Sequence, residues 1–140
     1  MLNLFNLLSD ALEERHKTIS DLEKDGLLSK NTVYKYSKFD ISLVSLIKIA
    51  NYLEMSIDYL LGLTNDNKFK KYNLANPNFY LNLKEIMKVN NVSQYKLSKD
   101  LLFSDSNFGR WKNGTMPSLS KLLDLSNYLS CPIDDFIDKE

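Results

Sequence analysis

Cysteine and histidine are almost absent from the sequence, which holds one residue of each, and this scarcity excludes several kinds of site. The lone Cys131 cannot form a disulfide within the chain, and we interpret it as a small apolar residue of the core. His16 has no cysteine or acidic partner at the spacing of a metal site, so we expect it on the surface. No nucleophile–base pair, carboxylate dyad or glycine-rich phosphate loop stands out. The sequence therefore predicts no enzyme, no metal site and no cofactor.

Long apolar runs and an excess of charge of one sign are also missing. No run approaches the roughly 18 apolar residues of a membrane span, and the first residues lack the basic start and cleavage site of a signal peptide. We therefore expect a cytoplasmic protein with no membrane partner. Eighteen basic and eighteen acidic residues cancel, so the total charge does not indicate a nucleic-acid binder. Residues 76–129, with seven basic and four acidic side chains, could still form a locally basic face.

What the sequence does contain is an internal repeat. At an offset of 75, Leu8, Leu22, Lys24, Asp25, Leu27 and Ser29 return as Leu83, Leu97, Lys99, Asp100, Leu102 and Ser104. After a one-residue insertion, at an offset of 76, Asn51, Tyr52, Leu53, Ile57 and Asp58 return as Asn127, Tyr128, Leu129, Ile133 and Asp134. A repeat this long predicts two copies of one small domain. We place the first copy at residues 1–63, a linker at 64–77 and the second copy at 78–140.

Apolar residues recur at helical spacing in both copies, and no alternating stretch is long enough for a strand, so the predicted fold class is all-α. In the second copy, Ser93, Ser104 and Ser118 stand at N-cap positions. The helix after Ser104 points Phe108 and Trp111 inward, which leaves outside Asp105, Ser106, Asn107, Gly109 and Arg110. A last short helix starts near Ile133. In the first copy we expect helices at 4–15, 19–25, 30–37, 43–53 and 57–61, the second, third and fourth capped by Thr18, Ser29 and Ser42.

Two short helices joined by a tight turn, the second with apolar residues at its fourth and seventh positions, make a helix-turn-helix. Residues 92–99, 104–114 and 117–119 carry this pattern, and with them nearly all of the second copy resembles the phage-repressor/Cro-type (XRE) helix-turn-helix family. The first copy departs from that family in two places. Ile19 stands where the family usually has glutamine, and residues 37–41 replace the family's Glu-Asn-Gly…Pro loop. The resemblance implies two tandem five-helix, lambda-repressor-like domains.

The resemblance also implies where DNA would bind. In this family the recognition helix enters the major groove with its first residues against base edges. The family's positions, carried over, give Lys30, Asn31, Tyr34, Lys35 and Lys38 in the first copy, and Gln94, Asp105, Ser106, Asn107, Arg110 and Asn113 in the second. Gln94 and Asn113 would be phosphate anchors. Asp105 can only accept a hydrogen bond, from a cytosine amino group. The alternative interpretation of the three lysines is an ordinary solvated face.

Two functions are consistent with these residues. The leading hypothesis is a sequence-specific transcriptional regulator that binds double-stranded DNA, a repressor of phage or mobile-element type, whose copies form an internal pseudo-dimer on two unlike half-sites. The alternative is a protein-binding inhibitor, antirepressor or anti-CRISPR-like, that keeps the fold and has lost or reduced DNA binding. The alternative is favoured by zero net charge, Asp105, Ile19 and the altered loop at 37–41. The regulator is favoured by Lys30, Asn31, Gln94 and Arg110. A third hypothesis gives DNA binding to one copy and dimerisation to the other, and a homodimer stays open.

Overall fold

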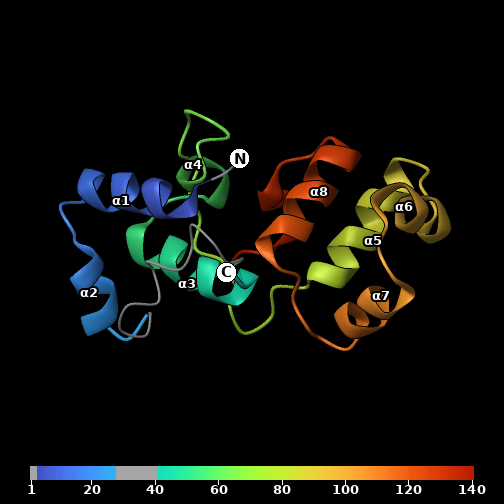
Figure 1. Ribbon diagram of the computed structural model, residues 1–140, viewed down its shortest axis with the longest axis horizontal. Helices are drawn as coiled ribbons and strands as arrows, with labels where there is room; N and C mark the ends of the chain where they lie inside the picture. Colours follow the sequence, from blue (N-terminus) through green and yellow to red (C-terminus); the bar gives the residue numbers. More distant parts are fainter. Residues whose placement is uncertain (1–2, 28–40) are drawn as a thin grey trace.

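The structure is a computed structural model, and it describes residues 3–27 and 41–140. Over these residues the chain has eight α-helices, one short 3-10 helix and no β-strand, which confirms the predicted all-α class. The helices of the first copy and those of the second form two groups side by side, with α4 and α8 near the middle (Figure 1). None of the described helices has the length and apolar character to cross a membrane.

Four helices of the first copy lie close to their predicted positions. They are α1 (Leu4–Glu14), α2 (Ile19–Lys24), α3 (Leu43–Leu53) and α4 (Ile57–Leu60). Thr18 and Asp21 form a capping box at the start of α2: the Thr18 hydroxyl accepts from the Asp21 N–H, and the Asp21 carboxylate accepts from the Thr18 N–H. Ser42 caps α3, as predicted. The expected helix at 30–37 lies outside the described residues.

The second copy contains α5 (Phe79–Val89), α6 (Gln94–Leu101), α7 (Asp105–Lys112), α8 (Leu119–Leu129) and the 3-10 helix η2 (Ile133–Phe136). Ser93 caps α6 by accepting from the Lys96 N–H, as predicted. Ser104 and Ser118 occupy the N-cap positions of α7 and α8 but make no side-chain cap bond. Their hydroxyls lie instead against other serine hydroxyls, at 2.7 Å for Ser104 and 3.3 Å for Ser118.

The one-residue insertion of the repeat lies inside α6, earlier than the sequence comparison placed it. The left-handed residue after α2 is Gly26, with φ 76°, and the left-handed residue after α6 is Leu102, with φ 59°. These two positions differ by 76. The next N–H in each copy, that of Leu27 or Phe103, donates to the carbonyl five residues back at 2.9 Å. Leu27 therefore corresponds to Phe103, and its pairing with Leu102 is wrong by one residue.

The single histidine and the single cysteine lie in different surroundings. His16 is exposed in the turn after α1, which agrees with its predicted surface position. Cys131 is only half-buried and packs against the edge of the core rather than inside it. Burial is the main cause that raises the pKa of its thiol to about 11, so the thiol is protonated at neutral pH.

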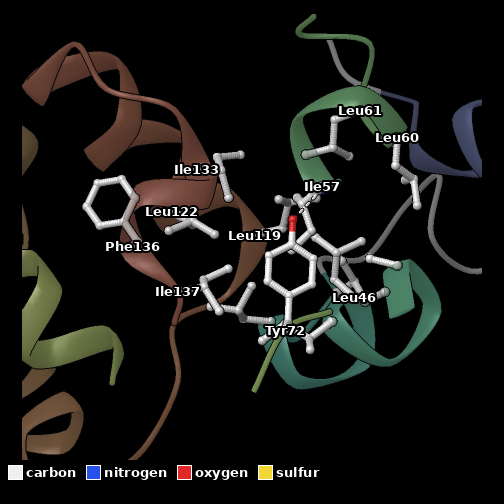
Figure 2. Packing of buried hydrophobic residues seen from close by; sticks show 14 of the residues in the cluster. Leu46, Ile57, Leu60, Leu61, Tyr72, Leu119, Leu122, Ile133, Phe136 and Ile137 are labelled. Carbon is white, nitrogen blue, oxygen red and sulfur yellow. Dashed lines mark hydrogen bonds between the residues drawn. The ribbon is translucent and has the colours of Figure 1, made fainter. Parts of the chain in front are cut away.

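One buried apolar cluster runs through both copies. Figure 2 shows the ring of Tyr72 among side chains of both copies, with Ile137 of the second copy on one side, Leu46 of the first on the other, and Ile57 at its hydroxyl end. Tyr72 belongs to the segment predicted as a linker, yet only 1% of its surface is exposed. Its hydroxyl accepts from the Ile57 N–H at 2.8 Å and donates to the Asp134 carboxylate. The linker therefore contributes to the core between the copies.

The copies also exchange a reciprocal pair of main-chain hydrogen bonds. The N–H of Leu43 donates to the Pro117 carbonyl at 3.3 Å, and the N–H of Leu119 donates to the Ile41 carbonyl at 3.0 Å. Together these bonds make an isolated antiparallel bridge. The two donors, Leu43 and Leu119, are 76 positions apart, and so are the two acceptors, Ile41 and Pro117. Each pair therefore occupies equivalent positions of the repeat. Exchange of equivalent contacts is typical of a two-fold interface, so the copies pack as an internal pseudo-dimer.

Candidate nucleic-acid interface

In the second copy, α6 and α7 form a helix-turn-helix. Buried side chains on one side of this helix pair pack it against the core. Leu97 of α6 is fully buried, and Phe108 and Trp111 of α7 are 3% and 4% exposed. The tight turn between the helices contains Leu102 in the left-handed conformation. Because Leu97, Phe108 and Trp111 face the core, the opposite face of the pair is open to a ligand.

Trp111 fixes the position of α7 through an aromatic cluster. Its ring lies 5.4 Å from Phe79 of α5, 6.1 Å from Phe103 and 5.2 Å from Phe108, each in an edge-to-face arrangement. Edge-to-face pairs add to the free energy of burial because the positive ring edge meets the negative ring face. The predicted inward direction of Phe108 and Trp111 is therefore what anchors α7 to the rest of the copy.

A tyrosine–aspartate pair supports the second helix in both copies. The Tyr128 hydroxyl of α8 donates to the Asp100 carboxylate of α6 at 2.6 Å, and the Tyr52 hydroxyl of α3 donates to Asp25 at 2.5 Å. The Tyr128 hydrogen bond, helped by Lys96 at 3.0 Å, lowers the pKa of Asp100. These residues belong to the repeat, and the structure shows that their repetition maintains the same helix–helix contact twice.

Asp105, Ser106 and Arg110 lie exposed on α7, on the side away from the core, as the resemblance implies. The Ser106 hydroxyl is within 2.7 Å of the Ser104 hydroxyl at the start of the helix. Asp105 stands in the first turn of α7, where the helix dipole favours a negative charge. Asp105 therefore stabilises α7 whether or not it contacts a base.

Asn107 is not where the sequence predicts it. It was expected on the exterior, but it is buried, with 6% of its surface exposed, and its side-chain oxygen accepts from Nη2 of Arg110 at 2.6 Å. The reason is its spacing, because Asn107 precedes the buried Trp111 by four residues and so lies on the same face of α7. This spacing is the signal in the sequence that could have placed it. Asn107 holds Arg110 rather than facing a ligand itself.

The two predicted phosphate anchors lie at the ends of the helix pair. Gln94 is the first residue of α6 and is half-buried. It lines a shallow pocket of about 430 Å³ together with Lys84 and Lys88 of α5. Asn113 is exposed directly after α7, and its N–H donates to the carbonyls of Gly109 and Arg110. The two lysines beside Gln94 were missed in the sequence, where they look like ordinary surface residues of an amphipathic helix.

The site residues predicted for the first copy, Lys30, Asn31, Tyr34, Lys35 and Lys38, lie outside the described residues. The start of α2 is described. There Ile19 is half-buried and packs against the core at the position that Gln94 holds in the second copy. The first copy therefore has an apolar contact where the second copy has the polar side chain of Gln94.

Comparison with protein families gives one result. The model of the Cro/C1-type helix-turn-helix DNA-binding domain matches twice, over residues 8–66 and 82–140. The matches include α2 in one copy and both α6 and α7 in the other, so they cover the helices described above. Neither a curated protein nor a solved structure matched the chain.

Proposed function

Because the chain belongs to the family of Cro/C1-type helix-turn-helix DNA-binding domains, we propose that it is a sequence-specific regulator that binds double-stranded DNA and represses transcription. The observation that supports this most directly is the reciprocal bridge between residues 41–43 and 117–119. It relates two domains of a DNA-binding family by a pseudo-two-fold axis, and DNA-binding proteins with two-fold symmetry bind two half-sites.

A single chain is the DNA-binding unit in this proposal. Figure 1 shows α2 of the first copy and α6 of the second toward opposite ends of the molecule. The contacts between α4 of the first copy and η2 of the second form within a single chain. The operator is then an imperfect inverted repeat, because the pseudo-two-fold relation inverts the half-sites and unlike residues read them. No homodimer is needed to complete the pair.

The residues have separate roles in the second copy. Arg110 and Ser106, exposed on α7, contact base edges, and arginine pairs best with guanine. Gln94 and Asn113 bind phosphates at the two ends of the helix pair, with Lys84 and Lys88 adding positive charge beside Gln94. In the first copy, Lys30, Asn31 and Lys35 read the other half-site, with Tyr34 and Lys38 beside them. Phosphate contacts fix the register, and base contacts supply the preference for sequence.

The test is selection of binding sites from random double-stranded DNA with the purified chain. We expect an enriched imperfect inverted repeat, and an affinity for it that falls steeply between about 50 mM and about 200 mM salt because bound counterions are released. The control is a chain with Lys30→Ala, Asn31→Ala and Arg110→Ala together, which should enrich no motif. If the unchanged chain enriches no motif and binds no DNA at low salt, the proposal is wrong.

A protein-binding inhibitor is the second candidate, and one observation favours it. The second copy exposes four large apolar side chains on α5, on α6 and in the turn after α6: 65% of Leu81, 77% of Val89, 77% of Tyr95 and 90% of Leu102. Exposed apolar side chains are available for contact with a protein partner. If the selection fails, binding of the purified chain to DNA-binding proteins, with Tyr95→Ser and Leu102→Ser as the matched variants, becomes the decisive measurement.

A further inference from the structure

We infer that Asn107 is a positioning residue for base recognition, which acts by holding the guanidinium of Arg110 in one orientation on α7. The inference rests on the proposed DNA-binding function. It assigns a specificity role to a side chain that does not itself reach the DNA, because Asn107 is buried while Arg110 is exposed.

The hydrogen bond between the two residues is short and charge-assisted. Nη2 of Arg110 lies 2.6 Å from the side-chain oxygen of Asn107. Hydrogen bonds with an ionised partner are stronger than those between neutral groups, and the packing around Asn107 leaves its side chain little freedom. The guanidinium carries five N–H donors in a fixed plane, so one bond sets the direction of that plane and leaves the others for a ligand.

Orientation matters more for base reading than for phosphate binding. An arginine that moves freely finds a phosphate oxygen in many directions, whereas two parallel bonds to guanine O6 and N7 require one plane and one angle. Holding the guanidinium in advance removes conformational entropy that would otherwise be lost on binding. The contribution of Asn107 should therefore appear in the discrimination between bases and much less in non-specific affinity.

A second feature of α7 is the glycine next to Arg110. Gly109 precedes Arg110 inside the helix, and a Cβ built on it would meet no atom within 4 Å. Glycine is unfavourable within a helix compared with alanine, and the fold gives no steric reason for it here. A bare position beside a fixed arginine is instead suited to close approach of the helix backbone to a ligand. This observation is independent of the Asn107 bond and concerns an exposed position directly beside Arg110.

The experiment uses the full chain and the motif that it selects. Base discrimination is measured as the ratio of Kd values for the selected site and for sites changed at each position. Arg110→Ala first identifies the positions that depend on this arginine, where we expect discrimination to fall roughly tenfold or more. At those positions, the Kd ratios of Asn107→Ala and of the size-matched Asn107→Leu should fall to within about twofold of the ratio for Arg110→Ala. Asn107→Asp, which keeps the acceptor oxygen, should retain it.

Three further readouts make the test decisive. The double variant Asn107→Leu with Arg110→Ala should discriminate no worse than Arg110→Ala alone, since residues that act as one unit are not additive. Fluorescence of the single Trp111 on the same helix shows whether each variant is folded, and Asn107→Leu replaces Asn107→Ala if the latter is not. Non-specific affinity at low salt should stay within about threefold for Asn107→Leu.

The inference is overturned if folded Asn107→Leu discriminates between bases like the unchanged chain while Arg110→Ala does not. It is also overturned if Asn107→Leu weakens binding equally at every position, because that result indicates a merely structural role. Failure of the unchanged chain to select any motif instead contradicts the proposed function, so the two failures are distinguishable.

Discussion

The carboxylate of Asp58 in the first copy accepts a hydrogen bond from the backbone N–H of Ile133 in the second, at 3.1 Å. It also accepts from the next N–H, that of Asp134, at 3.0 Å, so it caps η2 from outside. Strict two-fold symmetry would have Asp134 cap α4 in the same way. The Tyr72 hydroxyl stands in that place, because it binds both the Ile57 N–H and the Asp134 carboxylate. The linker therefore makes the two halves of the interface unlike.

Tyr72→Phe should destabilise the whole chain. The substitution keeps the buried ring but removes the partner of the Ile57 N–H and the donor to Asp134. A buried polar group left without a partner costs about 1–3 kcal/mol, so the free energy of unfolding in urea should fall by that amount. Tyr95→Phe, at an exposed tyrosine, is the control and should change little. Equal stability of Tyr72→Phe and the unchanged chain would contradict the role given to the hydroxyl.

The stability of Asp134→Asn, measured relative to that of the unchanged chain, should increase as the pH rises. Burial is the main cause that raises the pKa of Asp134 above its usual 3.8. A raised carboxyl pKa contributes stability below the unfolded pKa, and this contribution is lost as the pH rises through the folded pKa. Asparagine carries no such charge and still offers an oxygen to Tyr72. Unfolding at about pH 3 and about pH 7 measures the difference between variant and unchanged chain.

Asp138 provides the control of opposite sign for that experiment. Hydrogen bonds from Asn78 at 2.7 Å and Asn82 at 3.0 Å lower the pKa of Asp138. Its contribution to stability is present above the unfolded pKa and is lost as the pH falls through the folded pKa. Asp138→Asn should therefore be destabilising near neutral pH and lose this effect on acidification. The same pH trend for both variants would show that the carboxylates do not act as described.

Leu102→Gly should stabilise the second copy. Leu102 has φ 59° and is 90% exposed, so its side chain gains little by packing while its backbone is in a region that favours glycine. The left-handed conformation costs a residue with a Cβ about 1 kcal/mol, and Gly26 already fills the equivalent position. Urea unfolding followed by Trp111 fluorescence would show the gain. Leu102→Ala keeps the strain and should show none, and a gain as large as that of glycine would point to the side chain instead.

Trp111→Ala should destabilise the chain severely. The ring is 4% exposed and contacts three aromatic neighbours, so its removal leaves a cavity that α7 cannot fill. Truncation of a large buried aromatic side chain costs about 3–5 kcal/mol. Thermal unfolding followed by circular dichroism measures the loss, with the exposed Tyr95→Ala as control. A melting temperature near that of the control would mean that the cluster does not anchor α7.

Asp105→Asn should strengthen non-specific binding to DNA if α7 lies in the groove. The substitution removes a negative charge at the exposed start of α7, where it would be repelled by phosphates. The measurement is the Kd for random-sequence DNA at low salt. Asp124→Asn, an exposed acid on α8, is the charge-matched control and should have a smaller effect. Equal effects of the two variants would indicate only a change of net charge.

The features encoded by local spacing could be predicted from the sequence. Apolar periodicity located the helices, and the positions of Phe108 and Trp111 identified the buried face of α7. Tyr72 could not be placed in this way, because its partner Asp134 is 62 positions away and no periodic pattern connects them. Asn107 was misplaced because polarity usually indicates exposure, whereas here a neighbouring arginine satisfies its buried oxygen.

Because the bridge between residues 41–43 and 117–119 joins the two copies within one chain, dilution cannot separate them. A regulator made of separate subunits falls apart as its concentration drops below the dissociation constant of its dimer, so its occupancy of DNA depends on the square of concentration there. In one chain the partner is always present at a high effective concentration. For the regulator proposed above, occupancy of DNA should then rise with the first power of concentration.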